Sequence, residues 1–151
     1  MDQQRQRVLD GLRDLAAIQS ELGRQYARSR QMHATDAAAI VEIISAEEHG
    51  RPLTPARLAE RIGLTTGATS ILLNRLEEAG RIVRTRENSD RRIVTLHSTP
   101  GIQADADEYY EPLARRLDAV LHDHSPAELD LIETTVNRLR STINAYLEDA
   151  K

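Results

Sequence analysis

The stretch LTPARLAERIGLTTGATSILLNRLEEAG, residues 53–80, predicts two short helices separated by a tight turn. Thr54 is suited to cap the first helix, and Pro55 takes the first helical position, where its missing N–H costs nothing. Gly63 ends this helix, and Gly80 ends the second one. Aliphatic side chains on both segments predict a small shared core: Leu58, Ala59, Ile62, Leu64, Leu72 and Leu76. The stretch therefore predicts a helix-turn-helix.

The next segment, RIVRTRENSDRRIVTLH at 81–97, predicts a two-stranded hairpin. Residues 82–86 and 92–96 each contain β-branched side chains, and ENSD at 87–90 has the composition of a turn. A helix-turn-helix followed by a basic hairpin is the winged helix-turn-helix pattern. We therefore expect a mainly α-helical fold with a two-stranded β-wing.

Two further helices are predicted before this region. Residues 3–31 carry apolar side chains at three-, four- and seven-residue steps: Val8, Leu12, Leu15, Leu22 and Tyr26. Residues 34–48 predict a second helix, for which Thr35 or Asp36 is the expected N-cap.

Two long helices are predicted after the hairpin. The first spans residues 99–122, and Pro112 within it should kink it or start a new helix. The last begins with Ser125 as N-cap, Pro126 at the first position and Glu128 at the third, an arrangement that predicts a capping box.

The last helix carries a narrow apolar seam, which we define as Leu129, Ile132, Val136, Leu139, Ile143 and Tyr146. Its alternating three- and four-residue steps are typical of a coiled-coil interface. The seam can pack within its own chain or against a second copy. We favour a homodimer, because long terminal helices bury little apolar surface around so small a central module.

The positive charge of this acidic chain is concentrated in its middle. Residues 51–97 have a net charge of +4, whereas 1–50 have −2 and 98–151 have −6, within an overall charge of −4. A basic segment between acidic ends is typical of a nucleic-acid-binding surface. A chance distribution is the alternative explanation.

The second short helix has the composition expected of a helix that enters the DNA major groove. Its start, TTGATS, offers small side chains and hydroxyls, and a helix N-terminus favours nearby phosphates. The candidate contacts to base edges and phosphates are Thr65, Thr66, Gly67, Ala68 and Ser70. Arg75 could bind phosphate, or it could pair with Glu77 or Glu78 on the helix surface.

The hairpin supplies the second group of candidate DNA contacts. Four arginines flank its turn, namely Arg84, Arg86, Arg91 and Arg92. Arginine is favoured in a narrow minor groove by the stronger negative potential there. Asp90 would repel phosphate, so we expect it to support the wing by holding an arginine two positions away.

Residues 53–101 resemble the DNA-binding segment of the MarR (multiple antibiotic resistance regulator) family. The stretches LAERIGL, NRLEEAG and DRR carry the resemblance, and the flanking helices agree in number and order. The resemblance implies a homodimer on a pseudo-palindromic double-stranded operator, with a recognition helix in each major-groove half-site and a wing arginine in the minor groove. The family's Asp-x-Arg pair maps onto Asp90 and Arg92. Ile71 is a departure, since many relatives carry a polar or basic residue there.

The resemblance also implies a domain organisation. Residues 1–33 and 99–151 would form dimerisation helices around a DNA-binding lobe at 34–98. Family members often bind small aromatic or phenolic anions between these parts and then release DNA, so we expect a repressor with such an effector. The candidate pocket residues are Tyr26, Met32, His33, Tyr109 and Tyr110. For His33 a capping or surface role is the alternative.

Several classes of function are disfavoured by what the sequence lacks. There is no cysteine, which excludes disulfides, thiol catalysis and cysteine-ligated zinc. His122 and His124 are two residues apart and do not share a helix face, so we expect no metal site and no cofactor. The chain has no Gly-rich phosphate loop and no nucleophile elbow, and we expect no enzyme.

The sequence has no apolar run of the roughly 18 residues that span a bilayer, and no signal peptide. We therefore expect a cytoplasmic protein. The competing hypothesis for its function is a helical protein-interaction module, in which the apolar seam binds a partner and the arginines only add solubility.

Overall fold

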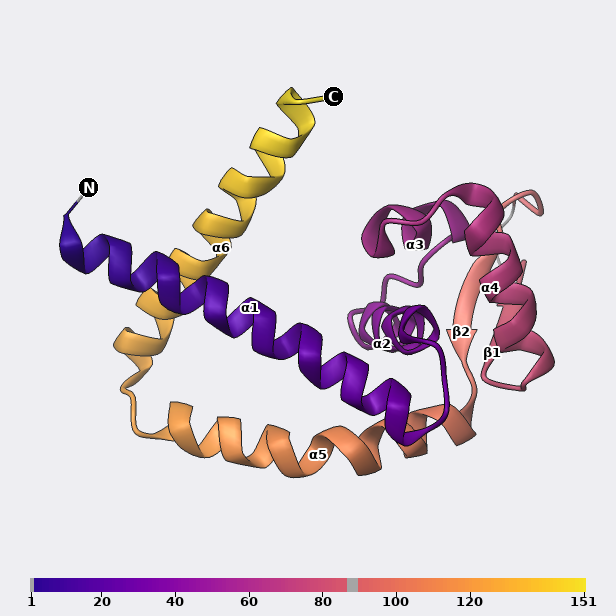
Figure 1. Cartoon of the computed structure of the whole chain (residues 1–151), viewed down its shortest axis with the longest axis horizontal. Helices are drawn as coiled ribbons and strands as arrows, with labels where there is room; N and C mark the ends of the chain where they lie inside the picture. The colour runs from indigo at the N-terminus through magenta and orange to yellow at the C-terminus, as the bar shows by residue number, and fades with distance from the viewer. Residues whose placement is uncertain (1, 87–89) are drawn as a thin grey trace. The chain divides into compact units, whose positions relative to one another are not determined.

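The computed structural model describes residues 2–86 and 90–151, so most of the predicted turn at 87–90 lies outside the described residues. The elements in chain order are α1 (Gln3–Ser29), α2 (Ala34–Glu48), α3 (Pro55–Ile62), α4 (Thr66–Glu78), β1 (Ile82–Thr85), β2 (Thr95–Ser98), α5 (Pro100–His122) and α6 (Pro126–Asp149) (Figure 1). β1 and β2 form an antiparallel two-stranded sheet. The predicted fold class, a mainly α-helical winged helix-turn-helix with flanking helices, is confirmed.

The chain divides into two compact units, Met1–Tyr109 and Tyr110–Lys151. The first unit contains α1 to β2 and the beginning of α5, and the second contains the rest of α5 and α6. α5 continues through Pro112, so a new helix does not start there. The domain limits predicted from dimerisation roles, 1–33, 34–98 and 99–151, stay a prediction.

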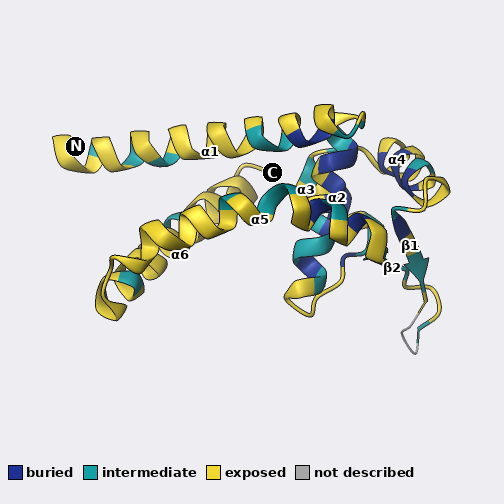
Figure 2. Ribbon diagram, turned by 90° about the horizontal axis from the view of Figure 1, so that it is seen from below, coloured by how far each residue is buried: buried dark blue, intermediate teal, exposed yellow. Residues whose placement is uncertain are grey.

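The core of the first unit is built around α2. Its buried side chains come from α2, α3 and the loop before it, α4, both strands and α5 (Figure 2): Ala39, Ile40, Ile43, Ala46, Leu53, Leu58, Leu72, Leu73, Leu76, Ile82, Leu96 and Ile102. Of the predicted core residues, Leu58, Ala59, Leu72 and Leu76 are buried, and Ile62 and Leu64 are partly buried at its edge. The core thus holds α4 by one face only.

The turn between α3 and α4 forms as the sequence predicts. The hydroxyl of Thr54 accepts a hydrogen bond from the Arg57 N–H at 3.3 Å, which caps α3. Gly63 ends the helix with φ = 68°, a left-handed conformation that favours glycine.

The predicted N-cap of α2 is wrong. His33 occupies the cap with extended backbone and makes no side-chain cap hydrogen bond. Thr35 and Asp36 lie inside the first helical turn, and Asp36 is buried. The carboxylate of Asp36 binds Arg75 of α4, a long-range contact that local sequence does not reveal.

The second strand of the hairpin begins later than predicted. β2 starts at Thr95, whereas the sequence indicates 92–96. Asp90 explains the difference: its carboxylate accepts from the Arg92 N–H at 3.0 Å, and its carbonyl accepts from the Ile93 N–H at 3.1 Å. These bonds commit residues 90–93 to a turn, because the same N–H groups cannot also join a strand ladder.

The capping box at the start of α6 is confirmed. The Ser125 hydroxyl accepts from the Glu128 N–H at 3.3 Å, and the Glu128 carboxylate accepts from the Ser125 N–H at 2.7 Å. None of the α6 side chains is buried within the chain, and of the apolar seam only Leu129 and Leu139 are partly buried. No helix in the described part of the chain combines the length and apolarity needed to cross a membrane.

Candidate nucleic-acid interface

α4 presents an outer face that is polar except for Ile71, because its three leucines are held in the core. Thr69, Leu72, Leu73 and Leu76 form the buried face. The exposed outer face, together with the cap, holds every major-groove candidate predicted from the sequence except Arg75: Thr65, Thr66, Gly67, Ala68 and Ser70.

The N-terminal turn of α4 is suited to an anion. The Thr65 hydroxyl accepts from the Ala68 N–H at 3.1 Å, which defines the start of the helix, and the first turn contains no acidic residue. The N–H groups at a helix start carry partial positive charge, which attracts phosphate.

Arg75 makes an ion pair that differs from the one predicted. Its Nε lies 3.2 Å from both carboxylate oxygens of Asp36, and its Nη2 lies 2.5 Å from Oδ1. Asp36 is only 2% exposed, whereas the Arg75 side chain is 40% exposed. These hydrogen bonds raise the pKa of Arg75 above its ordinary value. The alternative that the sequence leaves open, a surface pair with Glu77 or Glu78, is replaced by this pair with a buried carboxylate, and Glu77 binds Arg84.

Arg84 joins the wing to α4. Its Nε and Nη2 donate to the two carboxylate oxygens of Glu77 at 3.2 and 3.1 Å, and Nη2 also donates to Asn74 Oδ1 at 2.6 Å. The hydrogen bonds from Arg84 lower the pKa of Glu77. We call Arg84, Asn74 and Glu77 the Arg84 cluster. The guanidinium that the sequence places among the DNA contacts is thus engaged within the protein.

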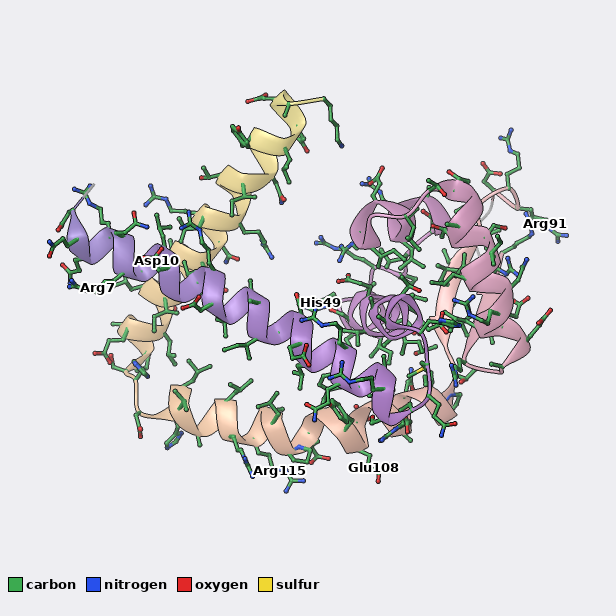
Figure 3. The ribbon with its side chains drawn as sticks, in the orientation of Figure 1. Arg7, Asp10, His49, Arg91, Glu108 and Arg115 are labelled. Atoms are coloured by element: carbon green, nitrogen blue, oxygen red, sulfur yellow. The ribbon has the colours of Figure 1, made fainter. Side chains whose placement is uncertain are left out.

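The other three wing arginines lie near the end of the hairpin. Arg86 donates to the carbonyl of Arg91, and the Arg91 side chain points away from the hairpin into solvent (Figure 3). The Nε of Arg92 donates to Asp90 at 3.1 Å, although the Arg92 side chain is 91% exposed. Hydrogen bonds from Arg92 hold the pKa of Asp90 below its ordinary value. The predicted pair of Asp90 with Arg92 is confirmed.

A groove of about 520 Å³ lies between α3, α4 and the wing, with Thr66, Ser70, Arg84 and Arg92 among its lining residues. Thr69 also lines it, and the Thr69 hydroxyl is buried without a hydrogen-bond partner in the described part of the chain.

Two of the predicted effector residues, Tyr26 and Tyr109, lie around an ion pair. Tyr26 is completely buried, and its hydroxyl donates to Asp105 at 2.7 Å. Arg30 Nε donates to the other Asp105 oxygen at 2.6 Å, which raises the pKa of Arg30. The Arg30 guanidinium lies 5.7 Å from the ring centroid of Tyr26 and 5.8 Å from that of Tyr109. Tyr26 and Tyr109 therefore belong to one cluster with Arg30 and Asp105.

The remaining effector candidates have other places in the fold. Met32 packs against the core, and His33 is exposed at the cap of α2. Tyr110 belongs to the second unit. Within residues 2–86 and 90–151 no group of three or more acidic, histidine or cysteine side chains is placed to hold a metal ion.

Sequence reasoning missed the residues that act through long-range pairs. Asp36 and Asp105 each bind an arginine far away in sequence, and neither shows a local pattern. Asn74 and Glu77 gave only a weak indication that they bind a common partner: they are three residues apart and so share a helix face.

Comparison with known proteins supports this reading of the fold. A model of the MarR family matches residues 31–93. The uncharacterized HTH-type transcriptional regulator YcgE of Bacillus subtilis is 28% identical over 100 residues, which are 66% of this chain and 65% of YcgE. The chain thus spans just under two thirds of the length of this relative.

Two solved structures share the fold at low sequence identity. The MarR family protein from Bacillus stearothermophilus has a TM-score of 0.66 and 22% identity, covering 95% of this chain and 99% of that one. A mutant of MepR from S. aureus, bound to an oligodeoxyribonucleotide, has a TM-score of 0.55 and 15% identity, covering 89% and 97%. Together the comparisons confirm the resemblance that the sequence predicts: residues 31–93 match the MarR family, and the solved structures share the winged helix-turn-helix fold.

Proposed function

We propose that the chain is a transcriptional regulator that binds double-stranded DNA through α4 and the wing. The observation that carries the proposal is the arrangement of α4, whose apolar face is held in the core while small and hydroxyl side chains face outward beside the wing arginines. Such a helix enters the major groove by its N-terminal end, and an adjacent arginine can enter the minor groove.

We divide the predicted contacts into two roles. Residues that approach DNA are Thr65, Thr66, Gly67, Ala68 and Ser70 on α4, and Arg86, Arg91 and Arg92 on the wing. Arg75 offers phosphate the part of its guanidinium that Asp36 does not engage. Asp90 orients Arg92, and Arg84 positions the wing on α4.

The relatives support the same function. MepR has been solved with an oligodeoxyribonucleotide, and YcgE is described as a transcriptional regulator. A regulatory function of this chain also agrees with its net charge of +4 over residues 51–97, which is the part that contains α4 and the wing. We infer a cytoplasmic regulator and no enzymatic activity.

The regulator is proposed to act as a homodimer on a pseudo-palindromic operator. The terminal helices show large aliphatic side chains to solvent, among them Val8, Leu15 and Ile18 on α1 and Val136 and Ile143 on α6. Covering these side chains with a second copy would remove apolar surface from water. A symmetric dimer would present one α4 and one wing to each half-site.

The regulator is further proposed to be a repressor that a small aromatic anion releases from DNA. Support comes from the Arg30 guanidinium, which lies against the rings of Tyr26 and Tyr109. An aromatic carboxylate could replace Asp105 as the partner of Arg30. A screen of aromatic carboxylates should find one that weakens DNA binding by the wild type and has no effect on Arg30→Gln. A screen without such a compound would contradict the effector.

The competing function is a protein-interaction module that binds no specific DNA. The test is a fluorescence-anisotropy titration with the DNA upstream of the protein's own gene, at several salt concentrations. Arg92→Ala should lower the slope of log affinity against log salt by about 1.8, because a dimer loses two positive charges that each displace counterions worth about 0.9 in the slope.

Arg115→Ala is the matched control, since it removes the same charge from an exposed side chain on α5. It should leave both the affinity and the slope unchanged. Equal slopes for all three proteins would contradict the role of the wing. If neither this DNA nor any sequence selected from a random duplex pool is bound more tightly than random DNA, the proposed function is wrong.

A further inference from the structure

One large aliphatic side chain stands on the outer face of α4. Ile71 is 66% exposed, whereas its neighbours Leu72 and Leu73 are buried. The helix is anchored in the core by its other face, so the fold does not use the Ile71 side chain. An isoleucine in this place remains available for a partner.

The surroundings of Ile71 are small or polar. Gly67 lies one turn before it and Asn74 lies three residues after it, on the same helix face. The other exposed side chains of α4 are hydroxyls, amides, carboxylates or no larger than a methyl group: Thr66, Ala68, Ser70, Glu77 and Glu78. Ile71 is therefore an isolated apolar group and not part of an apolar patch on α4.

The charge around this face favours DNA as the partner. The N-terminal turn of α4 has no acidic residue, and Arg84 and Arg92 line the same groove as Ser70. A single aliphatic group offers too little area for a protein interface. In the major groove the one apolar group on a base edge is the 5-methyl group of thymine.

We propose that Ile71 contacts the methyl group of a thymine at one fixed position in each operator half-site. The inference rests on the proposed function and adds to it a residue that determines which DNA sequence is bound. The hydroxyl and glycine positions around Ile71 allow close approach to the groove, and Ile71 then selects T·A over the other base pairs by apolar contact.

The test uses uracil, which lacks only the methyl group of thymine and keeps every hydrogen-bonding group. A binding site is first selected from a random duplex pool with the full-length protein. Each thymine of that site is then replaced by deoxyuridine, symmetrically in both half-sites. We expect one position at which the change weakens wild-type binding about fifteenfold, since each lost methyl contact costs about fourfold.

Ile71→Ala should bind the thymine and uracil versions of that site equally, and Ile71→Val should keep part of the preference. Val41→Ala is the control, since it shortens an exposed aliphatic side chain of α2. It should prefer the thymine version of the site over the uracil version to the same extent as the wild type. Ile71 is exposed, so its variants should melt like the wild type.

The outcomes separate the two proposals. A selected site with no methyl-dependent position, or with one that Ile71→Ala retains in full, would overturn the role of Ile71 and leave the DNA-binding function intact. A pool that yields no preferred sequence would overturn the proposed function and, with it, the role of Ile71.

Discussion

At the scale of single residues, two buried polar side chains of the first unit lie on or against α4. Asp36 is buried and paired with Arg75, and the hydroxyl of Thr69 is buried without a partner in the described part of the chain. A buried charge is tolerated when its hydrogen bonds are made, whereas a buried hydroxyl without one lowers stability. The two residues therefore lead to opposite predictions.

Asp36→Asn should destabilise the protein. The change leaves Arg75 with a neutral partner, and charged hydrogen bonds in such a setting are worth on the order of 2 kcal/mol. Chemical denaturation of both proteins measures the difference. Glu42→Gln, also on α2, breaks the surface pair with Arg61 and should cost much less. Equal losses for the two variants would contradict a special role of the buried pair.

Thr69→Val should stabilise the protein by about 1 kcal/mol, because it replaces an unpaired buried hydroxyl with a methyl group of similar size. The melting temperature should rise by roughly 3 °C. Thr69→Ser keeps the hydroxyl and loses the methyl group, so it should melt below the wild type. A lower melting temperature for Thr69→Val would show that the hydroxyl has a partner.

At the scale of elements, the sequence predicts those helix bounds and caps that depend on interactions between nearby residues. The bounds of α2, the cap and end of α3, and the capping box of α6 follow from residues within a few positions of one another. The start of β2 could not be placed, because the Asp90 turn competes with the strand for the same N–H groups. The role of Arg84 could not be placed either, because its partners lie on another element.

Arg84→Met should weaken DNA binding and leave the salt slope as in the wild type. Arg84 engages Asn74 and Glu77, so its loss disturbs the position of the wing and removes no phosphate contact. Arg92→Ala should instead lower the slope by about 1.8 for a dimer. Salt titrations of the two variants side by side make the comparison. A lower slope for Arg84→Met would place Arg84 on the DNA, as the sequence alone suggests.

The capping box makes the stability of α6 depend on pH. The hydrogen bonds from Ser125 lower the pKa of Glu128 below its ordinary value of 4.5. The contribution of the ionised carboxylate is therefore complete above that value and is lost as the pH falls through the lowered pKa. Glu128→Gln should be less stable than the wild type at pH 7, and the difference should shrink at about pH 3.

Urea denaturation at the two pH values measures this difference. Glu133→Gln removes the same charge from the middle of α6 and should leave the pH dependence as in the wild type. A gap between wild type and Glu128→Gln of the same size at both pH values would contradict a contribution from the ionised cap.

At the scale of the whole molecule, the apolar seam of α6 supports the proposed homodimer. Helices in proteins gain most of their stability from packing against other elements. α6 buries none of its side chains within the chain. The fold class could be predicted from the sequence because each helix and strand is recognised from residues close together in the chain. The partner of the seam could not be predicted, because periodicity shows that a helix has an apolar face and does not show what covers it.

Val136→Lys combined with Ile143→Lys should convert the proposed homodimer to a monomer. Charges at the two seam positions would be buried without partners in the interface, at a cost of several kcal/mol. Sedimentation velocity measures the change in mass. Thr134→Lys, on the opposite face of α6, should remain a dimer. A doubly substituted protein that still sediments as a dimer would exclude the seam as the interface.

The Arg84 cluster has a consequence for the spacing of base pairs in the proposed operator. Hydrogen bonds from Arg84 to Asn74 and Glu77 join the wing to α4 and fix the position of one element relative to the other. In the proposed complex, the number of base pairs between the major-groove contact and the minor-groove contact is then fixed within a half-site. A base pair inserted inside a half-site should therefore abolish binding, and the symmetry of the proposed dimer should fix the spacer between half-sites as well.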